Sequence, residues 1–153
     1  MTTLKRSVAY WVFIAFLAIS IFLMLIGQTL SVFDYDLTVR MGLQESPTDV
    51  GEFGVQVNRS FGASDTIVYV PLLLASLIGL LKKKRWSLLM TAATTGVSAY
   101  WSATILFIFL FSPGSQGYNY NPPVDIWLFV LAYLVFGVWG LAYLLIRGES
   151  LLQ

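Results

Sequence analysis

Two aspartates in strongly apolar surroundings have the clearest capacity for chemistry in this chain. Asp65 precedes Tyr69 by four residues, so both side chains share one face if the segment is helical. Asp125 lies eight residues before Tyr133 in a second apolar segment. A carboxylate in such a segment is costly unless it is paired or hydrated, and it is therefore a candidate binding site by default.

Two further aromatic residues, Tyr100 and Trp101, lie in the middle of the apolar stretch 86–111. Tyrosine and tryptophan are enriched at membrane interfaces, and that tendency does not explain two such residues in the middle of an apolar stretch. We therefore predict an outward-facing cleft with six ligand-binding residues: Asp65, Tyr69, Tyr100, Trp101, Asp125 and Tyr133. The simpler interpretation of the two aspartates is that each caps the start of a helix, where a carboxylate accepts unpaired backbone N–H groups.

The chain contains neither cysteine nor histidine. Disulfides, thiol redox chemistry and the commonest metal ligand are therefore excluded, as is the usual general base. No nucleophile, metal set or phosphate-binding motif accompanies the two aspartates. We expect no catalytic residue, no metal and no cofactor, and a protein that is more readily a binding protein than an enzyme.

The composition requires a membrane to position these residues. Of the 153 residues, 58% are hydrophobic and 11% charged, against about 25% charged in an average soluble domain. A membrane-crossing helix needs about 20 mostly apolar residues, and four stretches qualify: 8–26, 64–81, 86–111 and 124–146. The predicted fold is an all-α bundle of four transmembrane helices that forms a single membrane domain over residues 1–153.

The distribution of charge predicts the orientation of this bundle. Lysine and arginine in short loops stay on the cytoplasmic side during insertion. With four spans, seven of the nine basic residues fall on one side: Lys5, Arg6, Lys82, Lys83, Lys84, Arg85 and Arg147. Most of the acidic residues fall on the other side. We predict a multi-pass protein of the cell membrane with both termini in the cytoplasm.

The tetrabasic turn 82–85 joins the second and third stretches. Its four cations beside a membrane could bind anionic lipid headgroups. The alternative is that Lys82, Lys83, Lys84 and Arg85 act only as a determinant of topology.

The outer segment 27–63 alternates apolar and polar residues, which is typical of a half-buried strand. The alternation covers residues 33–41 and, more briefly, 52–58. We predict a β-hairpin over the outer end of the bundle, with a short amphipathic helix in residues 33–45 as the alternative.

Hydroxyl residues recur every three or four positions in the third stretch and so share one helical stripe. They are Thr91, Thr94, Thr95, Ser98 and Ser102. Hydroxyls and small residues promote close helix packing in lipid, so this helix is predicted to be the central packing element. A hydroxyl-lined conduction path is the alternative.

Three segments together resemble a pattern found in small uncharacterised prokaryotic four-helix membrane proteins: the run 63–73, the basic turn, and Tyr100-Trp101. The resemblance covers about half of the chain and implies no assigned activity.

Three functions fit these observations. The first is an accessory or assembly subunit of a larger membrane complex, with lipids and another membrane protein or a second copy as partners, and without nucleic acid. The second is a transporter or ligand-binding protein that uses the predicted cleft. The third is a lipid-modifying enzyme that uses the two carboxylates.

Overall fold

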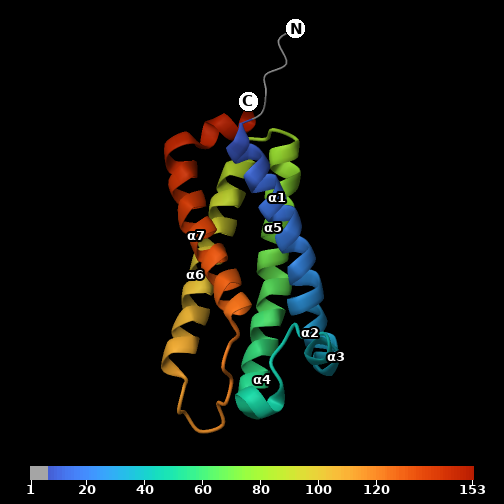
Figure 1. Ribbon diagram of the computed structural model, residues 1–153. Coiled ribbons are helices and arrows are strands. Elements are labelled where there is room, and N and C mark those ends of the chain that lie inside the picture. The colour runs from blue at the N-terminus through green and yellow to red at the C-terminus, as the bar shows by residue number, and fades with distance from the viewer. Residues whose placement is uncertain (1–6) are drawn as a thin grey trace.

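The computed structural model describes residues 7–153, and in this range the chain is helical and contains no strand. Four helical segments are long and apolar enough to cross a membrane: Val8–Phe33, Pro47–Leu81, Trp86–Phe111 and Val124–Leu152. They pack side by side as a bundle (Figure 1). The prediction of an all-α protein with four membrane-spanning helices is therefore confirmed.

Each long segment is built from one or more elements. The first contains α1 (Val8–Leu23), the π-helix η1 (Met24–Thr29) and α2 (Leu30–Phe33), and the short α3 (Tyr35–Arg40) follows it. The second contains α4 (Pro47–Ser64), the π-helix η2 (Asp65–Tyr69) and α5 (Val70–Leu81). The third is α6 (Trp86–Phe111), and the fourth is α7 (Val124–Arg147) with the 3₁₀ helix η3 (Gly148–Leu152).

The predicted β-hairpin is wrong, because local capping makes both of its halves helical. The Asp34 side chain accepts the Leu37 backbone N–H at 2.9 Å and so starts α3. Ser46 and Asp49 form a capping box with Pro47 in the first turn, which starts α4. The alternative of a short helix within residues 33–45 is the one found.

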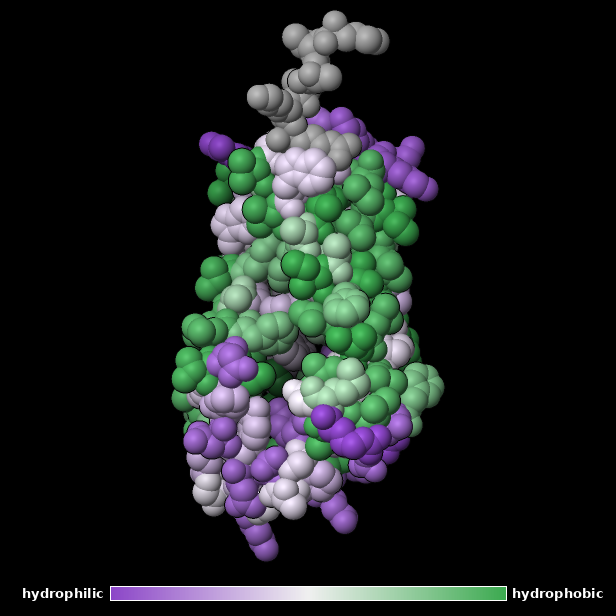
Figure 2. Space-filling model, turned by 45° about the vertical axis from the view of Figure 1, so that its right-hand side comes forward, coloured by the Kyte–Doolittle hydropathy of each residue, from purple (hydrophilic) through white to green (hydrophobic). Residues whose placement is uncertain are grey.

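The helical segment that contains the second predicted span, 64–81, extends well beyond that span. Residues 47–81 form one helical segment of 35 residues, about 50 Å long at 1.5 Å per residue, whereas the hydrocarbon core is about 30 Å thick. Most of α4 therefore projects beyond the apolar zone. On the face shown in Figure 2, apolar surface covers the middle of the bundle and hydrophilic surface lies at both ends.

The buried hydroxyl stripe of α6 faces its neighbouring helices. Thr91, Thr94, Thr95, Ser98 and Ser102 are all at most 1% exposed. The hydroxyls of Thr94 and Ser76 on α5 lie 2.9 Å apart. The stripe thus lies in helix interfaces, in agreement with its predicted use in packing.

Glycines of α7 allow this helix to approach α6 closely. A Cβ atom at Gly137 would lie 2.6 Å from the backbone nitrogen of Ala99, and one at Gly140 would lie 2.7 Å from a methyl group of Thr95. In a bilayer, close backbone approach of this kind supplies much of the attraction between helices.

We predict that Gly137→Ala lowers the free energy of unfolding by about 1–3 kcal/mol, because the backbone of Ala99 cannot move aside as a flexible side chain could. Gly96→Ala is the matched control, since a Cβ at Gly96 meets nothing within 4 Å. Unfolding by titration with a denaturing detergent measures both variants. Equal stability of the two would contradict the close-packing argument.

Candidate functional site

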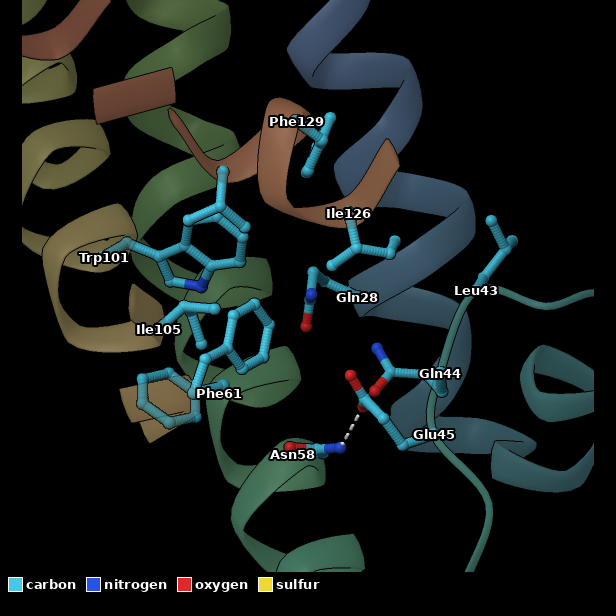
Figure 3. Close-up of a pocket in the computed structure, with 12 residues that line it drawn as sticks. Gln28, Leu43, Gln44, Glu45, Asn58, Phe61, Trp101, Ile105, Ile126 and Phe129 are labelled. Atoms are coloured by element: carbon cyan, nitrogen blue, oxygen red, sulfur yellow. Dashed lines mark hydrogen bonds between the residues drawn. The ribbon is translucent and has the colours of Figure 1, made fainter. Parts of the chain in front are cut away.

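A cleft opens at the end of the bundle opposite the basic turn, beneath the chain segment that joins α3 to α4. Its inner chamber measures about 130 Å³ and its outer chamber about 560 Å³. Four residues line both chambers, so the two adjoin: Glu45, Asn58, Ile105 and Phe109. Figure 3 shows the inner chamber, with Trp101 and Phe61 on one side and Gln44 and Glu45 on the other.

The segment that joins α3 to α4, residues 41–46, forms the roof of the cleft, and Asn58 of α4 holds it in place. Its side-chain amide donates to the Glu45 carboxylate at 2.7 Å and to the Tyr35 hydroxyl at 3.0 Å. The Tyr35 hydroxyl in turn donates to the backbone carbonyl of Glu45 at 2.9 Å. Gln44 donates from its side-chain amide to the Gly27 carbonyl at 3.1 Å. These hydrogen bonds join η1, α3 and α4 at the cleft through the segment that connects α3 to α4.

The loop between α6 and α7 forms the other wall of the outer chamber and docks on the start of α4. The Asn119 backbone N–H donates to the Asp49 carbonyl at 2.6 Å, and its side-chain amide donates to the Thr48 carbonyl at 3.2 Å. At the same place α4 has a kink at Gly51, whose φ of 69° favours glycine. A Cβ there would lie 3.1 Å from the Gly117 carbonyl oxygen, so this position suits glycine on both counts.

The cleft is electrostatically negative. Burial raises the pKa of the Glu45 carboxyl above its usual range, and nearby Asp49 raises it further, while donation from Asn58 opposes the shift. The pKa of Tyr120 is raised to about 12, first by burial and then by the charge of Glu45. Neither lysine nor arginine occurs among the residues that line the two chambers.

Two polar atoms of the cleft walls are buried without a hydrogen-bond partner among the described residues. They are the indole Nε1 of Trp101 in the inner chamber and the hydroxyl of Tyr118 in the outer chamber. Buried polar groups in native proteins are nearly always bonded, so an unpartnered one calls for an explanation. Both residues line the cleft, whereas the two atoms themselves are almost fully covered by the protein.

Below the inner chamber lies a core of hydroxyls and aromatic rings. The Tyr133 and Ser20 hydroxyls are 2.8 Å apart, and those of Tyr69 and Ser98 are 2.6 Å apart. The ring of Trp101 lies 6.0 Å from that of Tyr133, centre to centre. This aromatic contact joins the wall of the chamber to the core beneath it.

Asp65 lies in the middle of the second long helical segment, Pro47–Leu81, and its side chain is buried. It is 6% exposed, and its Oδ2 has no hydrogen-bond partner within residues 7–153. The prediction that Asp65 caps a helix start is wrong, because α4 continues into η2 without interruption. Asp125 does lie in the first turn of α7, which suits the positive end of a helix, although no side chain caps that helix by a hydrogen bond.

The six residues of the predicted cleft are thus divided. Asp65, Tyr69 and Tyr133 are buried in the bundle, and Trp101 lines the inner chamber. Tyr100 is 75% exposed and Asp125 is also exposed, so these two do not join the others. A role for any of the six in ligand binding stays a prediction.

Apart from Trp101, the residues that shape the observed cleft are not among the predicted site residues. Glu45 lies in the connection between the two predicted strands, and Asn58 lies in the second of them. The signal that could have corrected this is the capping box at Ser46 and Asp49, which announces a helix that carries Asn58 and Phe61 on one face.

The tetrabasic turn lies at the opposite end of the bundle and is exposed throughout. Arg85 forms a salt bridge with Glu149 at 2.6 Å, and the Lys83 side chain donates to the Gln153 carbonyl. These contacts tie the turn to η3, but an exposed ion pair contributes little stability. Headgroup binding by Lys82, Lys83, Lys84 and Arg85 stays a prediction.

Comparison with known proteins returns no match: no family model, no curated protein and no solved structure resembles the chain closely enough to count. The fold and the site define a four-helix membrane protein with a roofed, acidic cleft at one end.

We predict that Asn58→Ala loosens the roof of the cleft, because it leaves the Glu45 carboxylate and the Tyr35 hydroxyl without their shared donor. The expected cost is about 1–3 kcal/mol of stability, together with faster amide hydrogen exchange in residues 43–46. Gln56→Ala, at an exposed position of the same helix, is the control. Exchange in residues 43–46 that is no faster than in the control would refute the role given to Asn58.

Proposed function

We propose that this protein binds a small amphipathic ligand in the outward-facing cleft, as a membrane receptor or transporter. The adjoining chambers carry the proposal: together they hold about 690 Å³, from 130 and 560 Å³, and small-molecule sites typically span about 300–1,000 Å³. The walls are largely aromatic and aliphatic, with a few polar atoms placed among them. This composition is typical of sites that bind a mainly apolar molecule and orient it through its polar groups.

The geometry favours this function over an accessory or assembly subunit. A subunit that serves only to bind a partner through its helices has no need of a roofed cavity. Assembly with a second membrane protein in the cell membrane remains a prediction from the sequence.

Filling the cleft tests the proposal. Ile105 lines both chambers, so Ile105→Trp should lower the affinity for a cleft ligand by at least about tenfold, or about 1.4 kcal/mol. Equilibrium dialysis against protein in zwitterionic lipid nanodiscs, corrected with empty nanodiscs, measures binding of two probes, benzyltrimethylammonium and neopentylbenzene.

Phe107→Trp is the matched control, because it adds bulk to an exposed position of the same helix. It should leave the affinity unchanged. Absence of saturable binding of both probes to the wild-type protein would overturn the proposed function.

We also propose that the basic turn and the C-terminus face the cytoplasm and that the cleft faces outward. The positive-inside rule supports this orientation. The basic turn lies at one end of the bundle, and the chain segment that joins α3 to α4 lies at the other end (Figure 1). Lys5 and Arg6, which belong to the same argument, lie outside the described residues.

Because the chain has no cysteine, single substitutions can report the orientation. On intact cells an impermeant maleimide should label Gln116→Cys in the outer loop and leave Lys83→Cys unlabelled until the membrane is opened. The reverse pattern would invert the proposed orientation.

A further inference from the structure

We infer that the cleft selects an organic cation, a protonated or quaternary amine attached to an apolar body. The inference rests on the proposed function and specifies its ligand class. Three features of the cleft carry it: the sign of its charges, the aromatic character of its walls, and the position of Glu45 where the two chambers meet.

Among the described residues, every formal charge on the cleft lining is negative. Glu45 lines both chambers and Glu52 lines the outer one. Asp49 adds to the same field, since its charge acts on Glu45. The nearby guanidinium of Arg59 is directed elsewhere and donates to the Val32 carbonyl at 3.1 Å. An anionic ligand would therefore meet uncompensated repulsion, whereas a cation would be attracted.

Glu45 is placed to make direct contact with a ligand. Its carboxylate is directed into the inner chamber (Figure 3). The Asn58 amide donates to Oε2 alone, at 2.7 Å, so it fixes the carboxylate without neutralising it. When it is ionised, a partly buried carboxylate held in this way carries its charge in a medium less polar than water, where attraction to a cation is stronger.

Aromatic rings supply the complementary walls. The faces of such rings carry negative electrostatic potential and attract alkylammonium groups, and clusters of rings are the usual protein surface for binding quaternary amines. The inner chamber contains Phe61, Trp101, Phe109 and Phe129, and the outer chamber adds Phe53, Tyr118 and Tyr120. The same rings can pack against the apolar part of a ligand. The negative charges and the aromatic walls therefore both favour an amphipathic cation.

The pH dependence follows from Glu45. Its raised pKa means that the carboxylate takes up a proton at a higher pH than an exposed glutamate would, and a protonated Glu45 attracts no cation. The groups that face it are Tyr35 on α3, Asn58 and Asp49 on α4, and the loop residues Tyr118 and Tyr120. Burial raises the pKa of the three tyrosines, so they stay neutral around pH 7. Cation binding should therefore weaken as the pH falls through the raised pKa of Glu45.

The two probes named above test this directly, because neopentylbenzene replaces the quaternary nitrogen of benzyltrimethylammonium by carbon and keeps its shape. In nanodiscs the wild-type protein should bind the cation at least about tenfold more tightly than the neutral probe. Glu45→Gln should remove this preference and retain binding of the neutral probe, which reports an intact cleft. Asp36→Asn, at an exposed position of α3 that lines neither chamber, should keep the preference.

A second arm uses only the wild-type protein and so does not depend on the folding of a variant. The quaternary probe does not titrate, so its affinity should fall in acid while that of the neutral probe stays constant. Equal affinity for both probes, or a preference for the neutral one, would overturn the charge selectivity and leave ligand binding standing. Binding of neither probe would overturn the ligand-binding function as well.

Discussion

The bilayer imposes the constraint on which this structure depends: every backbone N–H and C=O group within it must find its partner in the chain, because lipid offers none. Four long helices satisfy this requirement, and they then associate through contacts other than the hydrophobic effect. Gly137 and Gly140 allow close approach of α7 to α6, and the buried hydroxyls of α6 bond to its own carbonyls or to hydroxyls of α5.

Outside the membrane the same chain is held by specific polar contacts. Asn58 joins Tyr35 and Glu45 through one amide, and Asn119 joins the second outer loop to the start of α4. These contacts give the cleft a roof and a wall made of segments far apart in the sequence. They also place the Glu45 carboxylate where the two chambers meet, and Asn58 of α4 donates a hydrogen bond to it.

The two π-helical segments are the least regular part of the bundle. η1 and η2 pack against each other. A Cβ at Gly62 would lie 2.6 Å from the Gln28 carbonyl oxygen, so the first and second helical segments approach closely at this level. Asp65 begins η2 at this level of the bundle. Wider turns of this kind occur often at functional sites. Here η1 contributes Gln28 to the lining of the inner chamber, and Phe61 on the same lining lies in α4, one turn before η2.

The sequence alone determined the membrane class, the four spans and the segregation of charge, because these depend on the length and polarity of continuous segments and not on contacts between them. It also singled out Trp101, which does line the cleft. For the outer segment the sequence favours a strand and leaves a helix in residues 33–45 as the alternative, because an apolar alternation over a few residues has the same appearance in a strand and in a capped helix. The capping box at Ser46 and Asp49 is the local signal for the helix that follows. The cleft itself was decided only by tertiary structure: Glu45, Asn58 and Tyr118 are separated by many residues, and only the docking of two outer loops onto α4 brings their side chains to one cavity.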